Sequence, residues 1–140
     1  MSGVIRRASP EDHDRISDIR FAVQENQLSD PSLVTDEDYA WFVENPGVWV
    51  WEEEGRILGF AAGDTRDCTI WALFVDPAHD RRGIGRALFE RACDILRQAG
   101  HRSALLTTDP GTRAERFYRA AGSTALGTNK NGEVIFRSSL

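Results

Sequence analysis

Cysteine and long hydrophobic runs are both scarce in this chain of 140 residues. The two cysteines, Cys68 and Cys93, stand far apart and form no C-x-x-C pair, which argues against a disulfide framework and for free thiols in a reducing compartment. No apolar run approaches the roughly 20 residues that cross a membrane, and the first residues lack the apolar core of a secretory signal. We therefore expect a cytoplasmic protein with no membrane partner.

Positive charge is also in short supply. Lys and Arg number 17 against 22 Asp and Glu, which gives a net charge of −5 and a pI of about 5.2. Because an acidic protein repels a phosphate backbone, we expect no nucleic-acid partner. We also expect no bound metal. Hydrophobic residues (41%) and charged residues (28%) stand in the proportions of a globular protein, and the length predicts a single domain over residues 1–140.

Hydrophobic periodicity and turn residues divide the chain into short elements. Ser9, Thr35 and Thr112 each predict the start of a helix, because each is a capping residue followed by an acid three positions later. The first helix is expected to bury Ile16, Ile19, Ala22 and Val23. Strands are expected at 4–7, 48–51, 56–63, 69–75, 103–108, 123–127 and 133–138, with a long helix ending at Gly100. This order predicts an α/β fold with a mixed sheet.

The most informative stretch joins a buried strand to that long helix. The strand Thr69–Val75 stops at Asp-Pro, and a basic turn with Gly83 and Gly85 follows before the amphipathic helix. The free N–H groups and the dipole at a helix start favour an anion, and glycines leave room for its approach. Taken alone, these residues fit either a phosphate site or a tight loop with solvated arginines.

Two consecutive segments carry a resemblance to a known family. Leu73-Phe74-Val75-Asp76-Pro77, followed by Arg82-Gly83-Ile84-Gly85-Arg86-Ala87-Leu88, resembles the central motif of the GNAT superfamily of N-acetyltransferases, Q/R-x-x-G-x-G/A. Asp80 departs from the pattern, since it stands in the Gln/Arg position. The resemblance implies a GNAT-type α/β fold, with a mixed, largely antiparallel central sheet flanked by helices in the order β-α-α-β-β-β-α-β-α-β-β. It also implies acetyl-CoA as cosubstrate, with its pyrophosphate on the loop amides.

The same resemblance implies roles around the thioester. In the family the sheet splits after the central strand, so the Leu73 amide would point at the acetyl carbonyl and Val75 would bind the pantetheine arm. The residues implied in cofactor binding are Leu73, Phe74, Val75, Arg81, Arg82, Gly83, Ile84, Gly85, Arg86 and Tyr118.

A second segment, Ala114 to Gly122, resembles the family's A-x-x-F-Y-x-x-x-G, whose tyrosine sits by the cofactor sulfur. Tyr118 would then act as the general acid for the leaving thiolate. The alternative is a core aromatic on the inner face of its helix. Two positions depart from the family: Gly111 replaces a frequent Asn, and Ser123 a usual Phe.

The acceptor side has weaker signals. Some relatives carry Glu where Thr69 stands, so Asp67 is the candidate base nearest in sequence; Glu25 or a water chain are alternatives, and Asp67 also fits a plain turn residue. The candidates for contact with the acceptor are Glu25, Asn26 and Trp71, which also fit solvated loop and core positions.

We therefore expect an N-acetyltransferase that moves the acetyl group of acetyl-CoA directly to a primary amine of a small molecule or peptide. A non-catalytic acyl-CoA-binding module is the alternative, because the Glu of some relatives is missing. An interaction protein with a structural glycine turn is a third reading. Homodimers are common in the family, and nothing in these residues decides for or against one.

Overall fold

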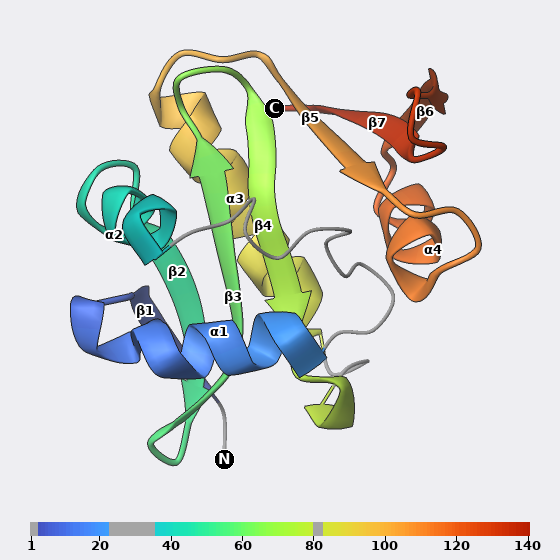
Figure 1. The fold of residues 1–140 in the computed structure, drawn as a ribbon. Helices are drawn as coiled ribbons and strands as arrows, with labels where there is room; N and C mark the ends of the chain where they lie inside the picture. The colour runs from blue at the N-terminus through green and yellow to red at the C-terminus, as the bar shows by residue number, and fades with distance from the viewer. Residues whose placement is uncertain (1–2, 23–35, 80–82) are drawn as a thin grey trace.

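The computed structural model describes residues 3–22, 36–79 and 83–140 (Figure 1). Within these ranges the strands are β1 (Val4–Arg7), β2 (Val48–Glu53), β3 (Arg56–Asp64), β4 (Thr69–Val75), β5 (Ser103–Thr108), β6 (Thr124–Thr128) and β7 (Val134–Ser139). The helices are α1 (His13–Ala22), α2 (Asp36–Glu44), α3 (Ile84–Gln98) and α4 (Arg113–Ala120), with short 3-10 helices at Pro10–Asp12 and Pro77–His79.

The strands form one sheet in the order β1-β2-β3-β4-β5-β7-β6. Neighbouring strands are antiparallel except β4 and β5, which are parallel. The predicted class, a mixed and largely antiparallel sheet in an α/β fold, is therefore confirmed, as is the order of strands and helices along the chain.

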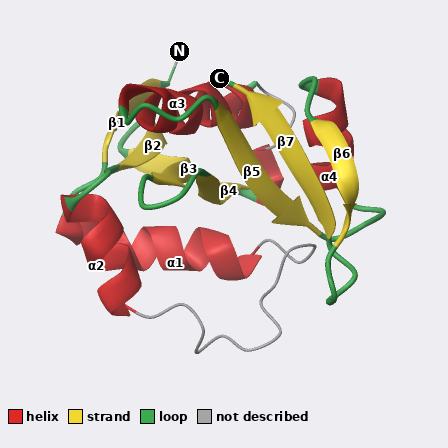
Figure 2. Ribbon diagram, turned by 90° about the horizontal axis from the view of Figure 1, so that it is seen from above, coloured by secondary structure: helices red, strands yellow, loops and turns green. Residues whose placement is uncertain are grey.

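Helices cover both faces of the sheet. α1 and α2 lie on one face and α3 on the other (Figure 2). Each face has its own hydrophobic cluster. None of the described helices is long and apolar enough to cross a membrane. The α1–α2 face buries Ile16, Ile19, Phe42, Phe60 and Phe74, and the α3 face buries Ile84, Leu88, Leu96 and Phe136.

Glycines on β3 let α3 approach the sheet closely. A Cβ atom on Gly59 would lie 2.9 Å from Cδ1 of Leu88 and 3.4 Å from Cγ2 of Ile84. A Cβ atom on Gly63 would lie 3.0 Å from the carbonyl oxygen of Ala92. The backbone of β3 therefore sets the position of α3, including its first turn.

β2 is longer than its hydrophobic residues predict. The sequence predicts an end at Trp51, but the strand continues to Glu53. Arg6 on β1 donates from Nε to Oε1 of Glu52 (3.2 Å), which holds this charged residue in the sheet. The predicted strand end at Trp51 is wrong for this reason, and a two-residue turn, Glu54-Gly55, follows Glu53.

The buried face of α1 matches the prediction in its first part. Ile16 and Ile19 are 1% and 0% exposed. Ala22, predicted to be buried, is exposed, because the end of α1 projects past β4 where the sheet divides (Figure 1). Val23 and the predicted cap Thr35 lie outside the described residues.

Candidate functional site

β4 and β5 are hydrogen-bonded neighbours only at the start of β4. Thr69 lies opposite Leu105, whose N–H donates to the carbonyl oxygen of Cys68 (2.8 Å). Beyond Thr69 no described strand pairs with this edge of β4, and Figure 1 shows the two strands separating toward the end of β4. The sheet thus splits where the family resemblance implies.

The unpaired edge of β4 presents the backbone groups of alternate residues. The N–H of Asp76 donates to the carbonyl oxygen of Leu58 on β3 (2.7 Å). Because successive residues of a strand direct their backbone groups to opposite edges, Val75 and Leu73 direct theirs away from β3. Phe74 directs its own toward β3 and buries its ring on the α1–α2 face, so it offers no backbone group to the unpaired edge.

The head of α3 lies just beyond this edge. Gly83 is the N-cap with a φ of 80°, and the first bond within the helix runs from the Ala87 N–H to the Gly83 carbonyl oxygen (3.1 Å). The N–H groups of Ile84, Gly85 and Arg86 precede this first bond and have no acceptor among the described residues, which suits an anion. Arg81 and Arg82 lie outside the described residues.

Gly85 stands where α3, β4 and α4 meet. A Cβ atom there would lie 3.6 Å from Cγ2 of Val75 and 3.7 Å from Cε1 of Phe117, which is ordinary van der Waals contact. The two glycines of the motif thus differ. At Gly83 the positive φ favours glycine, whereas at Gly85 a side chain would contact neighbouring residues.

An ion pair that sequence reasoning missed holds the end of β4. Arg15 on α1 donates to Oδ2 of Asp76 (2.8 Å), and the N–H of Ala78 donates to Oδ1 (3.0 Å). Burial alone would raise the pKa of Asp76, but these two hydrogen bonds to the charged form outweigh it and lower the pKa. The loop that leads to α3 is therefore fastened to α1.

Tyr118 lies on α4, whose predicted cap Thr112 accepts the Glu115 N–H (3.1 Å). The tyrosine is 7% exposed, and its ring centroid lies 5.7 Å from that of Phe89 and 5.9 Å from that of Phe136. Burial raises the pKa of Tyr118 well above its usual range. Like any phenol, Tyr118 is protonated at neutral pH, and burial makes it a weaker acid than an exposed tyrosine. Its ring also packs in the core.

A β-bulge turns Trp71 toward the α1–α2 face. Ala72 pairs with β3 in one register and Ile70 in another, so Trp71 is the extra residue between them. Its ring stacks on Phe42, with centroids 3.9 Å apart, and meets Tyr39 edge-on at 5.2 Å. Trp71 is half-buried and lies next to the unpaired edge of β4, as an acceptor-contacting residue would.

Arg20 on α1 lies beside these rings, and sequence reasoning missed it. Its guanidinium carbon lies 4.9 Å from the ring centroid of Phe74 and 5.7 Å from that of Trp71. Its Nη1 lies 3.5 Å from the Tyr39 hydroxyl, and the residue is 9% exposed. Its polar residue type among apolar helix neighbours was the only signal in the sequence.

Asp67, the other predicted acceptor-side residue that the structure describes, is not brought to this point. Asp67 precedes β4, and its carboxylate accepts the N–H (2.9 Å) and the hydroxyl (2.6 Å) of Thr69. Four residue steps along the strand, roughly 13 Å, separate Thr69 from Leu73. Asp67 as the base therefore stays a prediction without support from its position. Glu25 and Asn26 lie outside the described residues.

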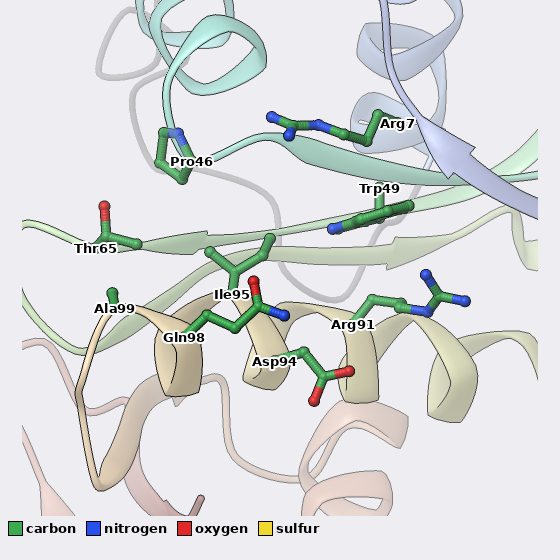
Figure 3. Close-up of a pocket in the computed structure, with 9 residues that line it drawn as sticks. All are labelled: Arg7, Pro46, Trp49, Thr65, Arg91, Asp94, Ile95, Gln98 and Ala99. Atoms are coloured by element: carbon green, nitrogen blue, oxygen red, sulfur yellow. The ribbon is translucent and has the colours of Figure 1, made fainter.

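A separate hollow of about 310 Å³ lies over the second half of α3 (Figure 3). Its lining includes Arg7, Trp49 and Arg91, and the guanidinium carbon of Arg91 lies 4.9 Å from the Trp49 ring centroid. It contains none of the predicted site residues. No group of three or more His, Cys, Asp or Glu side chains suited to a metal occurs in the described parts of the chain.

Two curated proteins resemble the chain in sequence. It is 34% identical over 101 residues to mycothiol acetyltransferase of Beutenbergia cavernae, which covers 69% of this chain and 30% of that protein. It is 35% identical over 81 residues to the peptidyl-lysine N-acetyltransferase YiaC of Escherichia coli K12, which covers 58% of this chain and 52% of that protein. The chain thus matches about half or less of each relative's length.

The fold is shared with solved structures. That of yncA from Salmonella typhimurium, determined with its cofactor acetyl-CoA, has a TM-score of 0.82 and 21% identity, covering 100% of this chain and 95% of that one. The model of the acetyltransferase (GNAT) family matches residues 13–122, which include the split of the sheet, the head of α3 and Tyr118. The chain belongs to the GNAT acetyltransferase family.

Proposed function

We propose that this protein is an N-acetyltransferase that moves the acetyl group of acetyl-CoA directly to a primary amine of a small molecule or peptide. The observation that supports this most is the unpaired edge of β4 beside the open head of α3. One feature suits an extended amide-containing arm and the other a diphosphate, and acetyl-CoA contains both.

In this proposal the N–H groups of Ile84, Gly85 and Arg86 bind the diphosphate, with the side chains of Arg81, Arg82 and Arg86 adding charge. Val75 pairs with the pantetheine amide as a neighbouring strand would. The Leu73 N–H donates to the acetyl carbonyl oxygen, where negative charge develops during the reaction.

The reaction then needs one proton transfer on each side of the thioester. The neutral amine nitrogen attacks the carbonyl carbon, the C–N bond forms and the C–S bond breaks. Tyr118 gives its proton to the leaving thiolate. The amine's own proton leaves to solvent or to a base that we do not assign, because Asp67 is bound to Thr69.

The test is acetylation of a panel of amines by the purified protein with acetyl-CoA, followed by mass spectrometry and by release of free CoA. We expect at least one amine to gain an acetyl group at a rate proportional to enzyme concentration. The two named relatives act on unlike acceptors by their names, so the panel includes small amines and lysine peptides. Failure of acetyl-CoA to bind would contradict the proposal.

A non-catalytic acyl-CoA-binding module is the second candidate, favoured by Thr69 in place of a family Glu and by the distant Asp67. Calorimetry separates the two candidates. Binding of acetyl-CoA without turnover of any amine would favour the binding module.

A further inference from the structure

Arg20 is a buried cation without an acidic partner in the described part of the chain. The residue is 9% exposed, and its Nε atom has no hydrogen-bond partner. Arg15, on the same helix, is by contrast paired with Asp76 at 2.8 Å. The contact of Arg20 with the Tyr39 hydroxyl, at 3.5 Å, is at the outer limit for a hydrogen bond.

Among the residues that the structure describes, none compensates the charge of Arg20. A guanidinium taken from water without a counter-charge is unfavourable, since it loses hydration and gains no ion pair. The rings of Phe74 and Trp71, at 4.9 and 5.7 Å from the guanidinium carbon, return part of this free energy through cation–π contact. Neither ring neutralises the charge, so an anion would complete the cluster.

This cluster lies beside the proposed point of acetyl transfer. Trp71 and Phe74 stand on either side of Leu73 along β4. The N–H of Leu73 is the group that we assign to the acetyl carbonyl. A molecule held at Arg20 therefore lies on the α1–α2 face, next to the edge along which the thioester is proposed to lie.

We infer that Arg20 binds a carboxylate of the acceptor, so that the substrates are amines that carry an acid group, with amino acids as the simplest case. The inference rests on the proposed acetyltransferase function. A guanidinium recognises a carboxylate through paired N–H donors, and the half-buried ring of Trp71 offers an apolar surface to the rest of the acceptor.

Matched acceptors test this inference. The standard amino acids and their α-carboxamides differ in the charge of one group, and each is offered to the intact protein with acetyl-CoA. We expect kcat/KM for the acids to exceed that for the amides by about tenfold to a hundredfold, the range for hydrogen bonds to charged groups. Arg20→Met removes this ratio, and Arg20→Lys retains part of it.

Arg97→Met is the matched control, because it removes an exposed arginine from α3 that is paired with Asp94. This variant is expected to keep the acid-to-amide ratio of the wild type. Calorimetric affinity for acetyl-CoA, measured for every variant, is expected to stay unchanged, which separates loss of the acceptor from loss of the cofactor. If Arg20→Met does not fold, the wild-type ratio and Arg20→Lys decide.

Equal kcat/KM for acids and amides in the wild type overturns the inference and leaves the acetyltransferase function intact. A ratio that Arg20→Met does not change, with a lower melting temperature, also overturns it and makes Arg20 a structural cation. If acetyl-CoA binds but no panel member is acetylated, titration of the CoA-loaded protein with N-acetyl amino acids and their amides decides instead: no preference for the acids overturns it. Failure of acetyl-CoA to bind contradicts the proposed function itself.

Discussion

Gly83 holds a φ of 80° at the head of α3, a backbone conformation that residues with a Cβ atom rarely adopt. No described atom lies within 4 Å of the place where its Cβ would stand. Gly100, just past the other end of α3, has a φ of 96° and equally open surroundings. The two glycines share their conformation and differ in which end of the helix they occupy, so each is a control for the other.

Gly83→Asp is expected to weaken acetyl-CoA binding at least tenfold, about 1.4 kcal/mol, because its carboxylate would face the diphosphate. Gly83→Asp and Gly100→Asp are both expected to lower stability by about 1 kcal/mol through backbone strain. Titration calorimetry and thermal melts measure the two effects. Equal acetyl-CoA affinities in the two variants would count against binding of the diphosphate at the head of α3.

Tyr118→Phe removes the proposed proton donor and keeps the ring that packs against Phe89 and Phe136. Turnover is expected to fall by about a hundredfold, the lower range for general acid catalysis, while acetyl-CoA affinity and melting temperature change little. Steady-state kinetics and calorimetry on the same preparation provide the comparison. A variant as fast as the wild type would leave Tyr118 as a core residue only.

At the scale of elements, β4 shows what the sequence predicts and what it does not. Its bounds, Thr69–Val75, follow from an apolar run closed by Asp-Pro. The bulge at Trp71 leaves no local mark, because an extra residue is defined only by the register with β3. The ion pair of Arg15 with Asp76 is invisible for the same reason, since its partners are far apart in sequence. Local patterns predict elements, and long-range pairing completes the site.

The two glycines of β3 support different parts of α3. Gly59→Ala is expected to displace the helix near Ile84, lowering both stability and acetyl-CoA affinity, whereas Gly63→Ala acts near Ala92 and lowers stability alone. Overpacking of this kind costs about 1–3 kcal/mol. Denaturant unfolding and acetyl-CoA titration distinguish them. The same loss of affinity in both variants would show that the head of α3 is not positioned separately.

The ion pair of Arg15 with Asp76 makes the stability of the fold depend on pH, and the sign of this dependence follows from the pKa of Asp76. The pKa of Asp76 is lowered in the folded protein, so its contribution is present above the ordinary value of 3.8 and is lost as the pH falls through the lower folded value. Asp76→Asn should therefore melt below the wild type at pH 7, with a difference that shrinks below about pH 4. Melting curves between pH 7 and pH 3 measure this. A difference independent of pH would exclude the charge as its cause.

At the scale of the whole molecule, the sheet consists of two parts. β1 to β4 form one and β5, β7 and β6 the other, and the register between them is Thr69 opposite Leu105 among the described residues. α3 lies on one face of the sheet, with its first turn near the end of β4, where the two parts lie apart (Figure 1). The proposed acetyl-CoA site therefore lies between the parts, and binding there is expected to join them.

Hydrogen–deuterium exchange tests whether acetyl-CoA binds along the unpaired edge of β4. Without ligand, the amide hydrogens of Leu73 and Val75 face no described acceptor and should exchange quickly, whereas that of Asp76, bonded to Leu58, should exchange slowly. Saturating acetyl-CoA should slow the first two amides and leave the third as it was. Unaltered exchange at Leu73 and Val75 would mean that the pantetheine does not run along β4. If exchange at both amides does slow, the cofactor supplies the cross-strand hydrogen bonds that β5 does not make to this edge of β4.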